Sequence, residues 1–66
     1  MKVTINGEPR EIVGARNVAE LLEELGLPGT AMLVEHNGVA LRREEWAGCA
    51  VVEGDRCELL RISAGG

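Results

Sequence analysis

The sequence predicts an α+β fold in which one main helix packs across a mixed sheet of four to five strands. Short segments of alternating polar and apolar residues lie on both sides of one amphipathic helical segment. Two Asn-Gly dipeptides join pairs of these segments, which is typical of β-hairpins. The resulting order is strand, strand, helix, strand, strand, strand. In such an order the crossover helix allows the first and last strands to lie side by side and parallel.

The first hairpin is predicted at the start of the chain. Lys2-Val3-Thr4-Ile5 alternates polar and apolar residues, as a half-buried strand does. Asn6-Gly7 follows, the dipeptide most favoured in type I′ turns. The return strand is expected over residues 9–13, with Pro9 near its start or at a sheet edge because proline has no amide proton to donate.

The main helix is predicted to begin after Asn17. The side-chain oxygen of Asn17 can accept from the backbone of Glu20, and Glu20 can reach back as in a capping box. Gly26 supplies the C-terminal stop, and Pro28 prevents the helix from resuming. Apolar residues follow the spacing of one helical stripe, and glutamates take the solvent side. The stripe is Val18, Leu21, Leu22 and Leu25, and the glutamates are Glu20, Glu23 and Glu24.

The second Asn-Gly dipeptide, Asn37-Gly38, predicts a second hairpin. Its strands are expected over residues 31–36 and 39–41. Arg43-Glu44-Glu45-Trp46 is expected to form a helical turn that places Trp46 against the core, and the turn is expected to end at Gly48.

The end of the domain is predicted to be a final strand over about residues 56–62. Val51-Val52 is a candidate short strand before it, and Glu53-Gly54-Asp55 has turn chemistry. Leu60 and Ile62 share one face of the final strand, and we expect them to pack inside; the alternative is that their neighbours form an apolar docking patch beside the tail. This architecture is the β-grasp, or ubiquitin-like, fold. We expect residues 1–62 to form the domain and residues 63–66 a flexible diglycine tail.

Composition narrows the possible functions. The chain has 66 residues and a net charge of −4, with eleven acidic against seven basic side chains. That balance argues against nucleic-acid binding, which needs basic surfaces to neutralise phosphates. The longest apolar runs have four residues, so neither a signal peptide nor a membrane span is expected. We expect a cytoplasmic protein with no membrane partner.

The cysteines and the histidine predict neither a metal site nor a catalytic site. Cys49, Cys57 and His36 offer at most three soft ligands, short of a closed zinc site. Cys57 is expected to be a small core residue and Cys49 a loop thiol, since no basic cluster that would activate either lies nearby in sequence. His36 directly precedes a tight turn, and we expect a turn-flanking or strand-face residue without triad partners.

The final dipeptide, Gly65-Gly66, is the only glycine pair in the chain. Because glycine has no Cβ, such a segment can thread a narrow cleft and adopt backbone angles that other residues avoid. Enzymes that activate the C-terminal carboxylate of a protein need that access. The alternative is a chain end without a function.

Four stretches form a pattern over essentially the whole chain. They are Val18-Ala19-Glu20-Leu21-Leu22, Val34-Glu35-His36-Asn37-Gly38, Arg43-Glu44-Glu45-Trp46, and Glu53-Gly54-Asp55 leading by one strand to Ala64-Gly65-Gly66. With this pattern the chain resembles ThiS, the thiamine-biosynthesis sulfur-carrier family. The last stretch is the most specific. Arg42 stands where the family often has proline, and His36 and Cys57 where it tends to have aliphatic residues.

The resemblance implies a carrier that is not itself an enzyme and has no catalytic residue or bound cofactor. A ThiF-like adenylating enzyme would use ATP to activate the carboxylate of Gly66, the covalent site, while Gly65 and Ala64 give access to it. A cysteine desulfurase or another persulfide donor would supply sulfur, leaving a thiocarboxylate. A ThiG-like thiazole synthase would accept that sulfur. The resemblance leaves open which donor loads the carrier and whether an acyl-disulfide intermediate forms.

Three alternatives share this fold. The small subunit of molybdopterin synthase carries sulfur on a similar tail but is usually longer. A ubiquitin-like modifier would join Gly66 to a lysine through an isopeptide bond. A ubiquitin-like interaction module would have an incidental diglycine, and truncating its tail would change nothing.

Overall fold

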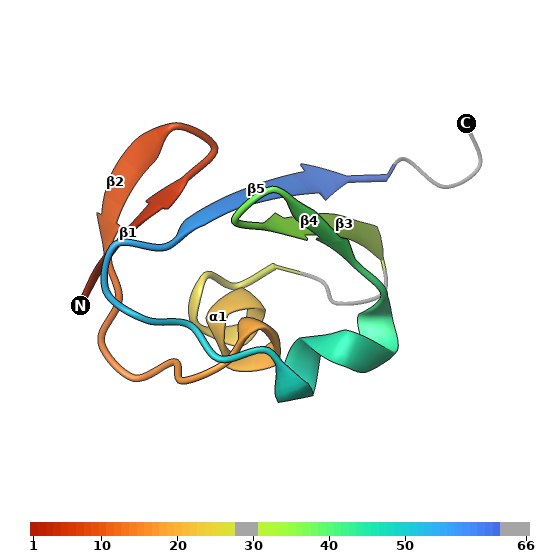
Figure 1. Cartoon of the computed structure of the whole chain (residues 1–66), viewed down its shortest axis with the longest axis horizontal. Coiled ribbons are helices and arrows are strands. Elements are labelled where there is room, and N and C mark those ends of the chain that lie inside the picture. Colours follow the sequence, from red (N-terminus) through yellow and green to blue (C-terminus); the bar gives the residue numbers. More distant parts are fainter. Residues whose placement is uncertain (28–30, 63–66) are drawn as a thin grey trace.

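A parallel pair of strands, the first and the last of the chain, lies at the centre of the sheet. The computed structural model describes residues 1–27 and 31–62. Its elements are β1 (Lys2–Ile5), β2 (Glu8–Glu11), α1 (Val18–Glu24), β3 (Met32–His36), β4 (Val39–Leu41), the 3-10 helix η2 (Arg43–Gly48) and β5 (Arg56–Arg61). The strands form one sheet of order β2-β1-β5-β3-β4, and α1 crosses one of its faces (Figure 1).

The pairing of the strands gives the mixed sheet that the sequence predicts. β1 is antiparallel to β2 and parallel to β5, with Thr4 opposite Arg56 and Ile5 opposite Cys57. β3 is antiparallel to both β5 and β4. The expected parallel contact between the first and last strands is therefore confirmed, and β5 has a neighbour on each side.

Both Asn-Gly turns are confirmed as well. Asn6 and Asn37 each have a φ of 51°, and the glycines that follow have φ of 83° and 84°. Two successive positive φ angles define a type I′ turn, whose twist matches that of the flanking strands. η2 forms over the predicted helical turn, and Trp46 is buried as expected.

Helix α1 begins and ends as its sequence predicts, with one difference. The Asn17 side chain accepts from the Glu20 amide at 2.9 Å. At the other end, Leu27 N–H donates to the carbonyl of Leu22 at 2.9 Å, and Gly26 has a φ of 72°, which together make a Schellman ending. The capping-box expectation is wrong in its second half. The Glu20 carboxylate accepts from the amide of Arg16, one residue before the cap.

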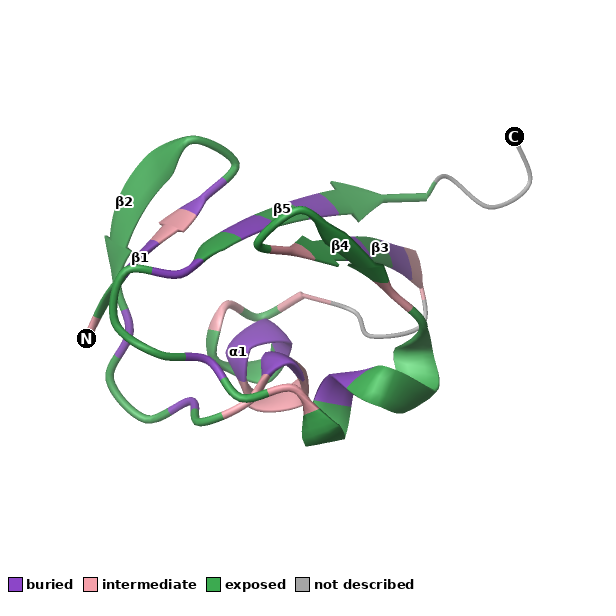
Figure 2. Cartoon of the chain, viewed as in Figure 1, coloured by how far each residue is buried: buried purple, intermediate pink, exposed green. Residues whose placement is uncertain are grey.

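The core lies between α1, η2 and the inner face of the sheet, and each of these parts contains buried residues (Figure 2). Aliphatic side chains make up most of it, with one tryptophan and one cysteine. Its members are Val3, Ile5, Ile12, Ala15, Val18, Leu21, Leu22, Met32, Val34, Trp46, Val51, Cys57 and Leu59. Burying this apolar surface is the main favourable term for so small a chain.

Three predicted segments differ from the structure. The return strand is Glu8–Glu11 rather than 9–13, because the next residues turn away and the amides of Val13, Gly14 and Ala15 donate to the Glu24 carboxylate. Glu24 is thus a cap for this loop as well as a solvent-side residue. The final strand ends at Arg61 rather than at residue 62, and the first strand of the second hairpin begins at Met32 rather than 31.

Val51-Val52 is not a strand. A single bridge pairs Asn17 with Ala50, and Val51 N–H then donates to the carbonyl of Arg16. Val52 N–H donates instead to the side chain of Asp55, so the chain bends into the turn before β5. Within residues 1–27 and 31–62, no helix is long and apolar enough to cross a lipid bilayer.

Candidate functional site

The segment that leads to the predicted covalent site is β5, the middle strand of the sheet. At its end Arg61 is paired with Met32, and Ile62 N–H donates to the carbonyl of Ala31 at 2.7 Å. The chain is therefore held by the sheet up to Ile62. The predicted site residues Ala64, Gly65 and Gly66 lie outside the described residues, as does Pro28.

A side chain from the first turn also holds β5. Asn6 Nδ2 donates to the carbonyl of Leu59 at 3.1 Å, and Asn6 Oδ1 accepts from the amide of Leu59 at 2.7 Å. The backbone N–H and C=O of Leu59 lie beyond the end of β1, on the side of β5 that faces it. These two bonds from Asn6 satisfy both groups. The amide side chain thus extends the parallel pairing beyond Ile5, where β1 ends.

The outer face of the sheet is apolar beside the end of β5. Leu33 and Leu60 are directly opposite each other, and their exposed fractions are 55% and 63%. The expectation that Leu60 and Ile62 pack inside is therefore wrong. Cys57 and Leu59 take the inner positions, because Cys57 is paired with the inward-facing Ile5 and side chains alternate along a strand.

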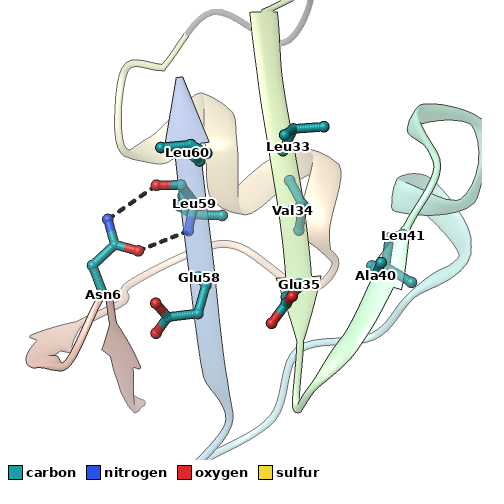
Figure 3. Close-up of a pocket in the computed structure, with 9 residues that line it drawn as sticks. All are labelled: Asn6, Leu33, Val34, Glu35, Ala40, Leu41, Glu58, Leu59 and Leu60. Carbon is teal, nitrogen blue, oxygen red and sulfur yellow. Dashed lines mark hydrogen bonds between the residues drawn. The ribbon is translucent and has the colours of Figure 1, made fainter. Parts of the chain in front are cut away.

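A shallow groove follows this outer face across β3, β4 and β5 (Figure 3). Its lining residues are Asn6, Leu33, Val34, Glu35, Ala40, Leu41, Glu58, Leu59 and Leu60. Glu35 and Glu58 are directly opposite each other, two residues from the leucine pair on each strand. Like charges in that register repel, so the pair costs stability in the free protein. The groove is apolar at the end near Ile62 and acidic at the other.

A second group of side chains lies at the start of β5. His36 Nδ1 is 3.3 Å from Cys49 Sγ, and His36 Nε2 is 2.8 Å from Asp55 Oδ2. The expectation that His36 has no triad partners is therefore wrong. The partners are 13 and 19 residues away along the chain, so no local motif shows them. Among the residues described, no group of three or more His, Cys, Asp or Glu is arranged to hold a metal ion.

Asp55 anchors this group as an ionised carboxylate. Burial opposes its ionisation, but hydrogen bonds from the Val52 amide, His36 and Asn37 outweigh that cost and hold the pKa of Asp55 below its usual value. Asn37 Oδ1 also accepts from the Arg56 amide. The network therefore joins the turn after β3 to the first residue of β5.

The two thiols lie in different surroundings. Cys57 is fully buried, as predicted, and burial raises its pKa to about 11, with a smaller contribution from the charge of Asp55. Cys49 is half-buried at the end of η2. Burial also raises the pKa of Cys49, and the negative charges of Asp55 and Glu45 add to this effect.

The five-stranded mixed sheet, the crossing helix and the central last strand define a protein of the β-grasp class. Comparison with family models identifies the ThiS family over residues 3–66. The chain belongs to the ThiS family.

Individual relatives agree with this assignment. The sulfur carrier protein ThiS of Escherichia coli is 30% identical over 66 residues, which cover both chains completely. The thiazole synthase of Paramagnetospirillum magneticum is 36% identical over 66 residues. That match includes all of this chain but only 20% of the longer protein.

Two solved structures of the thiamine biosynthesis protein ThiS from Geobacter metallireducens share the fold. The crystal structure has a TM-score of 0.84 at 39% identity and matches over the full length of both chains. The solution structure has a TM-score of 0.82, also at 39% identity, and the match covers 88% of that chain.

Proposed function

We propose that this chain is the sulfur carrier of thiazole formation in thiamine biosynthesis, and that Gly66 is its covalent site. The main support for the proposal is the match to the ThiS family, and the matched residues include Gly65 and Gly66. The E. coli relative of the same length is called a sulfur carrier. The proposal requires Gly66 to bear the free α-carboxylate.

The first step would be activation of that carboxylate. An ionised carboxylate is a poor electrophile, so a nucleophile cannot attack it directly. A ThiF-like adenylating enzyme joins a carboxylate oxygen of Gly66 to the α-phosphorus of ATP and releases pyrophosphate. The resulting mixed anhydride has AMP as its leaving group. Gly65 and Ala64 carry small or absent side chains and admit the chain end to the cleft of the enzyme.

The second step would be sulfur transfer. The terminal sulfur of a persulfide, supplied by a cysteine desulfurase or another donor, attacks the activated carbonyl and expels AMP. A thiol then reduces the acyl disulfide, which leaves a thiocarboxylate on Gly66 and a disulfide on the donor side. The carrier supplies the tethered carboxylate and no catalytic group, and these reactions belong in the reducing cytoplasm.

The acceptor of the sulfur would be a ThiG-like thiazole synthase. The P. magneticum protein supports this assignment, because a chain called thiazole synthase contains a stretch similar to this whole chain. Covalent linkage of two partners in one chain raises their effective concentration, so it is typical of proteins that work together.

We further propose that the adenylating enzyme docks on the exposed pair Leu33 and Leu60. Gly66 is only six positions after Leu60 in the chain. An extended segment of that length reaches about 20 Å. An enzyme bound to this face can therefore receive the carboxylate without moving the domain. The acidic pair Glu35 and Glu58 predicts basic residues on the enzyme beside its apolar contact.

The experiment is an intact-mass measurement after incubation with ATP, the adenylating enzyme and a persulfide donor. A gain equal to the replacement of one oxygen by sulfur supports the proposal, provided that deletion of Gly65-Gly66 eliminates the gain. An unchanged mass with an enzyme that loads the E. coli carrier would contradict it. Conjugates of this chain with other proteins would point instead to a ubiquitin-like modifier.

A further inference from the structure

Three side chains at the start of β5 form a linear relay that the carrier function does not use. Cys49 Sγ, His36 and Asp55 are joined by contacts of 3.3 Å and 2.8 Å at the two ring nitrogens of the histidine. They come from the end of η2, the end of β3 and the turn before β5. A thiol, an imidazole and a carboxylate in this order are the parts of an activated nucleophile.

The hydrogen-bond partners of Asp55 determine which ring nitrogen of His36 carries the proton. Asp55 accepts from the Val52 amide at 2.9 Å and from Asn37 Nδ2 at 3.1 Å, so it is surrounded by donors. His36 therefore carries a proton on Nε2 and donates it to Asp55 Oδ2. In the neutral ring, Nδ1 is then the basic nitrogen. That nitrogen is the one beside Cys49 Sγ, so the thiol is the donor and His36 the acceptor.

We propose that Cys49 is a thiol–disulfide exchange site for low-molecular-weight disulfides, in which His36 accepts the thiol proton and Asp55 positions His36. The sulfur of Cys49 attacks one sulfur of the small disulfide, and its proton passes to His36 Nδ1. A new sulfur–sulfur bond forms to Cys49 as the original one breaks. The leaving thiolate takes the proton from His36 and departs as a thiol. Cys49 is oxidised and the small disulfide is reduced, so the electrons balance.

The surroundings of Cys49 explain why such a relay is needed. Burial and the charges of Asp55 and Glu45 raise the pKa of the thiol, so it carries its proton at neutral pH. Only the thiolate is an effective nucleophile. Without a base, Cys49 would therefore react more slowly than an ordinary thiol. The same negative charges predict that neutral or cationic disulfides react faster than anionic ones.

The position of the relay separates it from the carrier chemistry. His36 is paired with Cys57 near the start of β5, whereas the chain toward Gly66 departs beyond the pairing of Met32 with Arg61. The relay thus lies at one end of the β3–β5 pair, and Arg61, the last residue of β5, lies at the other. The exchange reaction can be measured with the carrier alone, and it does not depend on the proposed function.

The test uses the full chain and the neutral probe 2-hydroxyethyl disulfide. We expect one adduct, located on Cys49 by peptide mapping, while fully buried Cys57 stays free and reports that the fold is intact. His36→Gln is the matched variant, since its amide can still donate to Asp55 but offers no basic nitrogen to Cys49. General-base assistance contributes about 10²-fold, so we expect a loss of that order in the rate at pH 7. The rate for the unaltered chain should change little between about pH 7 and 8, because the thiol transfers its proton internally.

Two results would overturn the proposal. One is a His36→Gln variant that keeps the rate while Cys57 remains protected. The other is a rate for the unaltered chain that falls tenfold for each unit of decreasing pH, as expected for an unassisted thiol. The second measurement needs no variant, so the proposal can be tested even if His36→Gln does not fold.

Discussion

The Asn6 side chain binds both backbone groups of Leu59, at 2.7 Å to the amide and 3.1 Å to the carbonyl. Asn37, in the other Asn-Gly turn, accepts from the Arg56 amide and donates to the Asp55 side chain. Each turn therefore shapes its own hairpin and also holds β5, which belongs to neither hairpin. The strand that leads toward Gly66 is therefore held by two residues whose local sequence predicts only turns.

Replacing Asn6 with glycine should weaken the hold on β5. Glycine tolerates the φ of 51° at this position, so the turn is kept while both side-chain hydrogen bonds are lost. Two such bonds predict a decrease of about 1–3 kcal/mol in the free energy of unfolding. Urea unfolding followed by circular dichroism measures it. Asn6→Asp keeps the acceptor for the Leu59 amide, so it should lower the free energy of unfolding by less than Asn6→Gly does. An equal decrease for the two variants would contradict this explanation.

The stability of the fold should fall in acid partly because of Asp55. Its hydrogen bonds outweigh burial and hold its folded-state pKa below the ordinary aspartate value of about 3.9. The stability it contributes is therefore complete above that value and is lost as the pH falls through the folded-state pKa. Unfolding free energy measured from pH 7 to 2 should decrease across this range.

Asp55→Asn supplies the comparison for that measurement. The asparagine places an amide donor among the donors that now face Asp55, so the variant should be less stable at pH 7. The difference in unfolding free energy between the variant and the unaltered chain should decrease as Asp55 becomes protonated at low pH. Glu24, whose pKa is lowered by the amides of Val13 and Gly14, remains in both proteins, so part of the acid dependence persists. A constant difference at all pH values would contradict the linkage.

Truncating Leu60 should impair activation without harming the fold. Because its side chain is 63% exposed, Leu60→Ala removes little buried area and should leave the melting temperature nearly unchanged. If the adenylating enzyme contacts it centrally, adenylation at low carrier concentration should slow by about tenfold or more. Val13→Ala, at another exposed apolar position, is the control and should have no effect. Equal rates for both variants would place docking elsewhere.

Removing both thiols should leave sulfur loading intact. The proposed chemistry occurs at the Gly66 carboxylate and draws its sulfur from a persulfide donor, so neither Cys49 nor Cys57 is required. Cys57→Ala creates a small space in the core and should lower stability by about 1 kcal/mol. The Cys49→Ala, Cys57→Ala double variant is therefore assayed well below its melting temperature, by the same intact-mass gain. A failure to load would show that one thiol participates in the transfer.

The elements that could be predicted from the sequence are those whose signals are local. Positive φ at an Asn-Gly pair, the cap at Asn17 and the stop at Gly26 depend on neighbouring residues, and the structure has them where predicted. The helical apolar stripe follows from amphipathic spacing, and Trp46 is buried as the predicted helical turn requires. These features, together with the pattern shared with the ThiS family, were sufficient for the fold.

The outward face of β5 and the contacts between distant side chains depend on how the whole chain packs. Both faces of that strand carry apolar residues, so alternation alone cannot orient it, and the register with β1 turns Leu60 to the surface. His36, Cys49 and Asp55 meet because the end of β3, the end of η2 and the turn before β5 come together in space. Such contacts depend on how strands pair over long separations, and no short-range pattern in the chain encodes them.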